Sequence, residues 1–292
     1  MNIFSGLESI VKTDCPLSEY TWYGLGGNAE YLIIPTSIEQ LETIVQRCNE
    51  NDIPMRVLGF GSNLLVDDAG VRGAVIKLEG DSFTSPRFDG EYLTAGAAAG
   101  LNKLVLDCVR KGLSGLEALT GIPGSVGGAV KMNAGGNFGD IGTAVESVTL
   151  MDSDGTIFEK TKPELVFDYR WANITAKFIL SAKIKLVESD SEQMLRTLKE
   201  VWIYKKNSQP LNTENAGCVF KNPRGLSAGA LIDRAALKGL QIGGAQVSEK
   251  HANFIIAHKG CKSADVKRLI EAVRQRVKEK FDIDLELEIE IW

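Results

Sequence analysis

The stretch GLEALTGIPGSVGGAVKMNAGG, residues 115–136, decides the fold, because it mixes seven glycines with apolar side chains and few charges. Flexible linkers are polar and rich in serine, so this stretch is not a linker. A backbone of small residues can lie flat against a large planar ligand and present its N–H and C=O groups to the edges of that ligand. A tightly packed glycine-rich turn explains the same composition equally well, and the residues alone leave both interpretations open.

Two further glycine patterns lie nearer the N-terminus. Residues 59–63 (GFGSN) separate the apolar runs Val57–Leu58 and Leu64–Val66. Their successive N–H groups could form an anion-binding nest, although a simple hairpin turn is slightly favoured for this segment alone. Residues 24–29 (GLGGNA) fit the dinucleotide pattern G-x-G-x-x-A, but the chain then runs through β-branched and aromatic residues into Pro35 instead of opening a helix. We therefore predict a turn into a strand there.

Length and composition indicate a globular protein of about two domains. The 292 residues are 44% hydrophobic and 24% charged, with a formal net charge of −5, which excludes disorder and a nucleic-acid-binding protein dominated by basic charge. The five cysteines form no C-x-x-C pair, so neither a disulfide framework nor a metal site is expected. We find no signal peptide and no apolar run near the ~18 residues that cross a bilayer, so the cytoplasm is the expected location.

Hydrophobic periodicity predicts alternating helices and strands. Ser37 is the expected N-cap of the first helix, because Gln40 completes a capping-box spacing with it. The expected helices cover 38–48, 101–109, about 191–202 and, after a cap at Ser263, about 264–277; the expected strands cover 31–34, 75–78, 178–187 and 285–291.

In order and spacing, motifs along nearly the whole chain resemble the UDP-N-acetylenolpyruvoylglucosamine reductase family (MurB). Each motif alone is weak evidence for this family, but their order and spacing together are highly specific to it. The motifs are Leu58–Val66, Gly121–Gly128, Met132–Gly135, Tyr169–Arg170, Gln209–Pro210, Ala216–Pro223, Leu237–Gly239, Gly243–Ala245, Ser248–Phe254 and Leu285–Ile289.

The resemblance implies an α+β fold, with a two-lobe FAD-binding domain of the vanillyl-alcohol-oxidase (PCMH) type and a smaller C-terminal α/β substrate-binding domain. We expect the FAD-binding region over residues 1–190, with lobes at about 1–79 and 80–190, and the substrate-binding domain over 191–292. The implied FAD is noncovalent, and a histidyl link in the N-terminal lobes is excluded because His251 and His258 are the only histidines. NADPH is the implied reductant. The short segment between Trp202 and Cys218 resembles the shorter subclass of the family.

An isoalloxazine ring is a planar ligand that suits such glycine loops. The resemblance places the cofactor-binding residues in both loops. They are Gly59, Phe60, Gly61, Ser62, Asn63, Gly121, Ile122, Pro123, Gly124, Ser125, Gly127, Gly128 and Ala129.

The implied reaction reduces the enolpyruvyl C=C of UDP-N-acetylglucosamine enolpyruvate to UDP-N-acetylmuramate in peptidoglycan precursor synthesis. Hydride from flavin N5 reaches the methylene carbon, and negative charge spreads into the carboxylate. Cys218 matches the family's proton donor, which is commonly serine, and a neutral thiol with a pKa of ~8.5 is a better acid than a hydroxyl. The alternative is a small buried apolar cysteine.

Two charged residues complete the implied catalytic set. Arg170 matches the arginine that binds the enolate oxygens; the alternative is a surface salt bridge. Glu288 matches the glutamate that assists at the enol, where it would be protonated or would hydrogen-bond the thiol. Alternation alone does not separate Glu288 from Glu286 and Glu290, which share its face.

For the substrate, the resemblance implies that Lys206 binds the diphosphate, with Lys205 as a near competitor, and that Asn222 hydrogen-bonds the substrate. The expected partner is this small molecule, with no nucleic acid and no membrane. The sequence leaves the oligomeric state open, with a monomer as the working expectation.

Two other functions are compatible with the same fold. One is a FAD oxidase of hydroxy acids or sugar lactones, and the other is an inactive flavin-binding relative. Turnover driven by NADPH without peroxide would argue against the oxidase. A flavin that never bleaches with NADPH would support the inactive relative. Arg170, Cys218 and Glu288 together favour the reductase.

Overall fold

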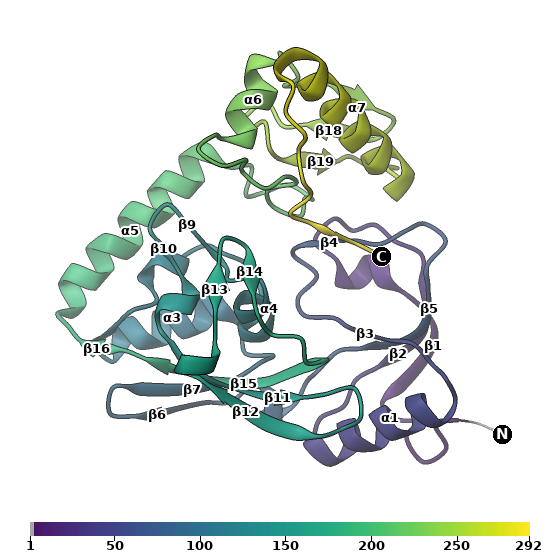
Figure 1. The fold of residues 1–292 in the computed structure, drawn as a ribbon, viewed down its shortest axis with the longest axis vertical. Helices are drawn as coiled ribbons and strands as arrows, with labels where there is room; N and C mark the ends of the chain where they lie inside the picture. The colour runs from purple at the N-terminus through teal and green to yellow at the C-terminus, as the bar shows by residue number, and fades with distance from the viewer. Residues whose placement is uncertain (1–2) are drawn as a thin grey trace. The chain divides into compact units, whose positions relative to one another are not determined.

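The computed structural model describes residues 3–292, which form two compact units (Figure 1). Unit 1 takes in the chain up to Thr13, then Tyr31–Phe60 and Gly73–Tyr204; unit 2 takes in Asp14–Glu30, Gly61–Arg72 and Lys205–Trp292. Each unit has its own hydrophobic core. These two units do not coincide with the expected flavin-binding lobes at about 1–79 and 80–190. The limits of those lobes remain a prediction.

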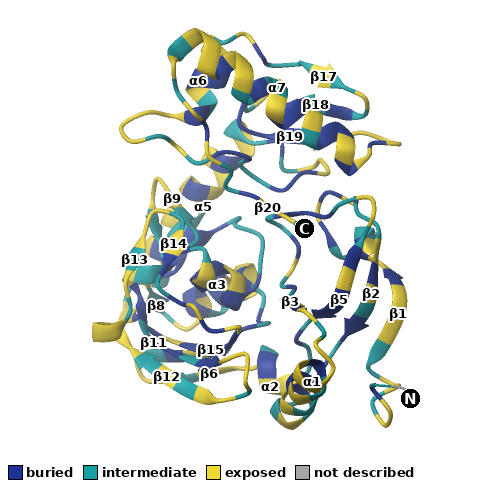
Figure 2. Ribbon diagram, turned by 45° about the vertical axis from the view of Figure 1, so that its right-hand side comes forward, coloured by how far each residue is buried: buried dark blue, intermediate teal, exposed yellow. Residues whose placement is uncertain are grey.

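A five-stranded antiparallel sheet is the centre of unit 1. Its strands lie in the order β12 (Ile157–Thr161), β11 (Val145–Met151), β15 (Phe178–Lys185), β7 (Tyr92–Gly96) and β6 (Pro86–Asp89). Much of β11 and β15 is buried (Figure 2). The strand predicted over 178–187 is confirmed as β15.

Two helices of unit 1 follow the predicted apolar patterns. In α1 (Ile38–Glu50), the Ser37 hydroxyl accepts from the Gln40 N–H at 3.3 Å, which confirms the N-cap. The Gln40 side chain instead reaches back to the Thr36 N–H at 2.9 Å. In α3 (Leu101–Arg110), Gly112 takes a φ of 70° after the last turn, as a C-terminal glycine does.

A second sheet has the order β1 (Val11–Pro16), β2 (Asn28–Ile33), β5 (Val71–Ile76) and β3 (Met55–Val57). β3 runs parallel to β5. The strand predicted at 31–34 is the end of β2, so residues 24–29 do lead into a strand as expected. The chain passes between the units within β1, β2 and β5.

Short elements complete unit 1. They are helices α2 (Asp81–Thr84) and α4 (Val126–Lys131), 3₁₀ turns η2 (Glu117–Leu119), η3 (Ile141–Thr143) and η4 (Lys162–Glu164), and strands β8 (Leu113–Ser114), β9 (Gly135–Gly136), β10 (Gly139–Asp140), β13 (Phe167–Asp168), β14 (Trp171–Ala172) and β16 (Val187–Glu188). Helix α4 packs against β15 and β7. Helix α5 (Ser191–Ser208) carries the chain from unit 1 into unit 2.

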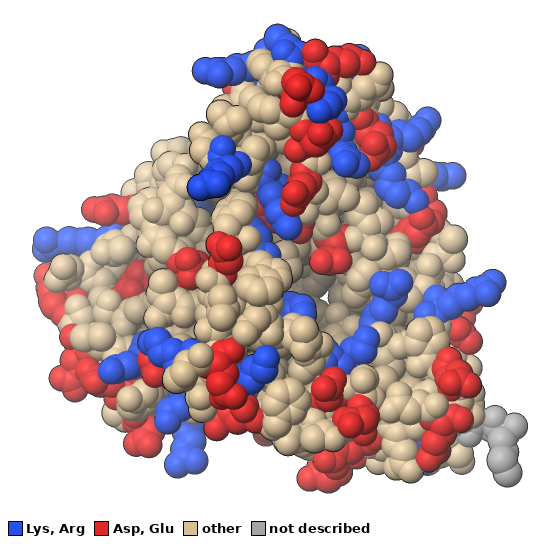
Figure 3. All heavy atoms as spheres, in the orientation of Figure 1, with Lys and Arg blue, Asp and Glu red and all other residues tan. Residues whose placement is uncertain are grey.

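In unit 2, helices α6 (Ala228–Arg234) and α7 (Ser263–Phe281) accompany the antiparallel sheet β17 (Gln241–Ile242), β18 (Ala245–Val247) and β19 (Ile255–Ala257). Turn η1 (Leu17–Tyr20) also belongs to this unit. Lys/Arg and Asp/Glu side chains are interspersed over α6 and α7 on the face shown in Figure 3, which therefore carries no patch of one sign there.

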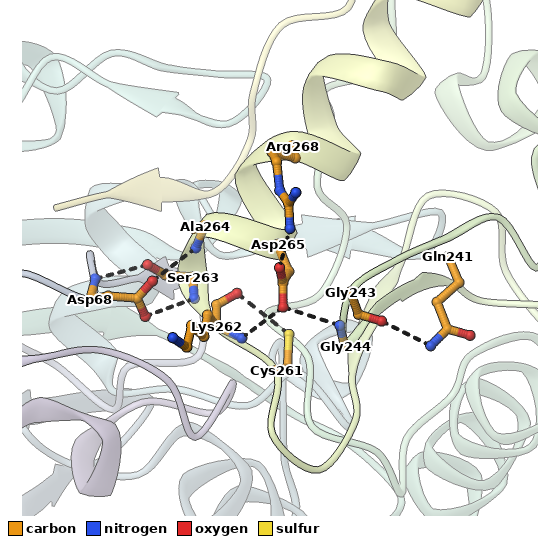
Figure 4. A network of polar contacts seen from close by, with 10 residues as sticks. All are labelled: Asp68, Gln241, Gly243, Gly244, Cys261, Lys262, Ser263, Ala264, Asp265 and Arg268. Carbon is orange, nitrogen blue, oxygen red and sulfur yellow. Dashed lines mark hydrogen bonds and ion pairs between the residues drawn. The ribbon is translucent and has the colours of Figure 1, made fainter.

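The N-terminus of α7 is held from a distant part of the sequence (Figure 4). The Asp68 carboxylate accepts from the N–H groups of Ser263 at 2.9 Å and Ala264 at 3.1 Å. The predicted cap at Ser263 is one residue off, because Lys262 is the N-cap and Ser263 the first helical residue. The Ser263 hydroxyl instead accepts from the Asp68 N–H at 2.9 Å.

The strand expected over 285–291 is only partly present. β20 (Glu290–Ile291) pairs in parallel with β4 (Leu64–Leu65), and an isolated bridge joins Leu287 to Phe220. Leu285 and Ile289 are buried whereas Ile291 is exposed, so the apolar side of this segment is not buried along its whole length. Within residues 3–292, no helix combines the length and apolarity that crossing a membrane requires.

Candidate functional site

The two glycine loops meet inside unit 1. A Cβ at Gly59, between β3 and β4, would lie 2.9 Å from the Ser125 hydroxyl at the start of α4. That hydroxyl caps α4 by accepting from the Gly128 N–H at 3.3 Å. Glycine is therefore needed at position 59 for the two loops to pack against each other, before any ligand is considered.

The loop 121–128 is fixed by backbone hydrogen bonds on both sides. The Gly127 N–H donates to the Ala97 carbonyl at 2.8 Å, and a Cβ at Gly127 would lie 2.9 Å from the Ala97 Cβ. The Gly124 carbonyl accepts from the Leu101 N–H at 3.0 Å. Gly121 and Gly124 have φ values of 72° and 147°, which favour glycine.

The other predicted cofactor residues differ in exposure. Ile122 and Pro123 are half-buried, Ala129 is buried, and Phe60 is 41% exposed. The unit boundary runs through the first loop, since Gly61, Ser62 and Asn63 are assigned to unit 2. A Cβ at Gly61 would clash with the Tyr20 carbonyl.

Glu117 is a buried residue beside the glycine loops that the sequence interpretation missed. Its carboxylate is buried just before Gly121, where Oε2 accepts from the Gly115 N–H at 2.8 Å. Oε1 has no hydrogen-bond donor among residues 3–292. Because Oε1 is shielded from solvent, this carboxylate braces the turn that leads into the loop 121–128 and does not itself meet a bound group. The half-buried glycine backbone of residues 121–124 is the surface that fits a planar ring such as a flavin. In the sequence, Glu117 could have been noticed because it is the one acidic residue in the apolar, glycine-rich stretch 115–136.

Arg170 stands in the tight turn between β13 and β14 with a φ of 55°, in the left-handed region. Its Nη2 donates to the Gly135 carbonyl at 2.9 Å, and its guanidinium carbon lies 5.1 Å from the centre of the Tyr169 ring. Asn133, also missed from sequence, braces this turn: its amide donates to the Asp168 carbonyl at 2.9 Å.

Cys218 and Glu288 lie on neighbouring backbone segments of unit 2. The Glu288 N–H donates to the Val219 carbonyl at 2.8 Å, directly after Cys218. Both Cys218 and Glu288 are half-buried. The structure also distinguishes the glutamates that alternation could not: Glu286 is exposed, with its carboxylate 3.6 Å from the Lys221 ammonium, and Glu290 is exposed.

The predicted substrate residues also belong to unit 2. Lys206 is exposed at the end of α5, and its carbonyl accepts from the Lys250 ammonium. Lys205 is only 7% exposed, so the two competing lysines have different environments. The Asn222 side chain is exposed and its Oδ1 accepts from the Ala228 N–H at 3.0 Å.

Burial changes the protonation of several groups. It raises the pKa of the Cys48 and Cys261 thiols to about 11 and that of Cys108 to about 12. Burial, followed by the Lys238 ammonium, lowers the pKa of His251. The Nδ1 atom of His251 accepts from the Asn253 N–H at 3.2 Å, as a neutral imidazole can.

Comparisons with known proteins agree with this architecture. Residues 29–161 match the FAD binding domain family, and residues 209–292 match the C-terminal domain of UDP-N-acetylenolpyruvoylglucosamine reductase. The reductase of Lachnoclostridium phytofermentans is 38% identical and aligns with 99% of this chain and 96% of its own length. That of Bacillus subtilis is 40% identical and aligns with 94% of this chain and 92% of its own length.

The solved structures give the same result. The MurB crystal structure from Thermus caldophilus superposes with a TM-score of 0.82 at 40% identity, covering 97% of this chain and 98% of its own. A glucose oxidase variant of Phl p 4 reaches a TM-score of 0.50 at 13% identity over 65% of this chain and 45% of its own, a likeness of fold alone. The predicted fold class is confirmed. The chain belongs to the UDP-N-acetylenolpyruvoylglucosamine reductase family.

Proposed function

We propose that this chain reduces the enolpyruvyl double bond of UDP-N-acetylglucosamine enolpyruvate to give UDP-N-acetylmuramate, with NADPH as reductant and noncovalent FAD. The family membership supports the activity, and the match of residues 29–161 to the FAD binding domain supports the cofactor. We place the reaction in the cytoplasm, in a monomer.

The backbone hydrogen bond from the Glu288 N–H to the carbonyl of Val219, the residue after Cys218, is the observation that supports the assignment of the proton donor. FAD, when bound, supplies hydride to the methylene carbon of the alkene. Cys218 then gives the proton on Sγ to the adjacent carbon, and the thiolate that remains is reprotonated from solvent. Two electrons and two hydrogens are thus added across the double bond.

Arg170 and Glu288 stabilise the negative charge that develops on the substrate. The fixed guanidinium of Arg170 binds the carboxylate oxygens as they take on enolate character. Its position in a braced two-residue turn limits how far it can move, which favours a preorganised role. Glu288 acts in its protonated form or as a hydrogen-bond partner of the thiol, because a bare carboxylate would repel the enolate.

Lys206 binds the diphosphate of the substrate, and Asn222 hydrogen-bonds the substrate. Lys206 is exposed and its ammonium can therefore meet a diphosphate, whereas Lys205 is buried at the same helix end. The Asn222 carbonyl oxygen accepts from the Ala228 N–H, which fixes the side chain in an exposed position where it can hydrogen-bond the substrate. Replacement of Lys206 by alanine is expected to raise the KM for the substrate more than it lowers kcat.

Anaerobic stopped-flow spectroscopy tests the proposal. The flavin should bleach with NADPH and recolour when UDP-N-acetylglucosamine enolpyruvate is added. Cys218→Ala is expected to keep the bleaching and lose the recolouring, and Cys218→Ser should retain part of it. Cys48→Ala, which removes a buried thiol from α1, serves as the control and should behave as wild type. Near-normal recolouring in Cys218→Ala would remove the thiol from the mechanism, and peroxide formation with hydroxy acids would favour an oxidase.

A further inference from the structure

Asn253 binds the backbone immediately after Cys218 through its carbonyl and through both polar atoms of its side chain. It is 4% exposed. Its carbonyl accepts from the Val219 N–H at 2.8 Å. Its side-chain Oδ1 accepts from the Phe220 N–H at 3.0 Å, and its Nδ2 donates to the Phe220 carbonyl at 2.8 Å. The side-chain amide of Asn253 thus hydrogen-bonds both the N–H and the carbonyl of Phe220, as the backbone of a neighbouring strand would.

The opposite edge of the same segment is bound by the Glu288 strand. The Val219 carbonyl accepts from the Glu288 N–H and the Lys221 N–H donates to the Glu286 carbonyl, both at 2.8 Å. The Glu288 carbonyl in turn accepts from the side-chain amide of Asn63 at 3.1 Å. Residues 219–221 therefore lie between Asn253 on one side and residues 286–288 on the other.

We propose that Asn253 is a positioning residue for proton transfer, which holds the Cys218 thiol in register with Glu288. The proposal rests on the function proposed above. Val219 and Phe220 are almost fully buried, so water cannot replace the two hydrogen bonds that the amide makes. Without them the segment would shift, and a displacement of about 1 Å between reacting groups costs a rate factor on the order of 10².

Replacing Asn253 by aspartate distinguishes a positioning role in proton transfer from a contribution to fold stability alone. Asn253→Asp keeps the size of the side chain. Its ionised form can accept from the Phe220 N–H but repels the Phe220 carbonyl, whereas its protonated form can again donate to that carbonyl. The geometry is therefore restored as the pH falls. The titratable or charged groups on the segments around Asn253 include His251, Lys238, Cys218, Lys221, Glu286 and Glu288. Dividing each rate by the wild-type rate at the same pH removes their contribution.

The experiment follows both half-reactions in the FAD-loaded enzyme between pH 5.5 and 8.5, roughly the range where a buried carboxyl titrates. At pH 8, Asn253→Asp is expected to recolour about 10–100-fold more slowly than wild type and to bleach with NADPH within about twofold of it. The relative rate of recolouring should recover as the pH falls. Asn49→Asp is the matched control in unit 1. It adds the same charge and removes one side-chain hydrogen bond, the one from the Asn49 amide to the Ser153 carbonyl. Its relative rate of recolouring should not change with pH.

The outcomes separate cleanly. Wild-type recolouring by Asn253→Asp at every pH would overturn the proposal. Parallel loss of both half-reactions without acid recovery, together with a lowered melting temperature, would also overturn it, because Asn253 would then be structural only. Failure of the wild-type enzyme to recolour with the substrate would instead refute the function proposed above.

Discussion

Selective alkylation of Cys218 follows from the contrast among the thiols. Only the thiolate reacts with iodoacetamide. Burial raises the pKa of Cys48 and Cys261 to about 11 and that of Cys108 to about 12. At pH 8 such thiols are ionised to ~0.1% and ~0.01%, against ~25% for an ordinary thiol of pKa ~8.5. Reaction at these three sites should therefore be slower than at free cysteine by factors of ~200 to ~2000, before steric protection is counted.

Peptide mass mapping over a time course measures the rates. Cys218 is half-buried, whereas Cys15 and the other three cysteines are buried, so Cys218 should carry the first label. Bound substrate should protect it. Recolouring of the flavin should be lost with the same time course as Cys218 is labelled. Labelling of Cys48 or Cys108 as fast as Cys218 would refute the reasoning, because a thiol that reacts quickly is neither buried nor raised in pKa.

Three substitutions and one control variant test side-chain packing and helix capping, each by urea denaturation. The hydroxyl of the fully buried Tyr23 has no partner among residues 3–292, so Tyr23→Phe should raise the free energy of unfolding by about 1–3 kcal/mol; a decrease would reveal an unseen partner. Asp68→Ala removes the acceptor of two N–H groups at the start of α7 and should lower that free energy by about 0.5–2 kcal/mol, which an unchanged midpoint would contradict. Gly127→Ala places a Cβ 2.9 Å from the Ala97 Cβ and should cost about 1–3 kcal/mol, whereas Gly136→Ala meets nothing within 4 Å and should be neutral; equal effects would contradict the packing.

Local signals predicted local structure well. Ser37 was identified as a cap because the helix and its cap are adjacent in sequence, and the residues after Gly24–Ala29 indicated a strand because β-branched residues favour one. The α7 cap was one residue off for the opposite reason. Its first N–H groups are bound by Asp68, which is 195 residues away from Ser263, and no local pattern contains that contact.

The same limit applies to the candidate site. The family motifs pointed to Cys218, Arg170 and Glu288, but period-two alternation treated Glu286, Glu288 and Glu290 alike. The distinction arises from the bridge to residues 219–221, which forms only when the C-terminal segment folds back.

The backbone of Arg170 gives independent support for its role. A left-handed conformation costs a residue with a Cβ about 1–2 kcal/mol relative to the right-handed one, and glycine or asparagine would occupy this turn at lower cost. The hydrogen bond from the guanidinium to the Gly135 carbonyl offsets part of that free energy. The Asn133 side-chain amide also stabilises the turn by donating to the Asp168 carbonyl. Strained residues persist where the surrounding structure holds them, and they concentrate at functional sites. A stability argument alone would favour a smaller residue here, so the conformation of Arg170 supports the proposal that its side chain binds the substrate carboxylate.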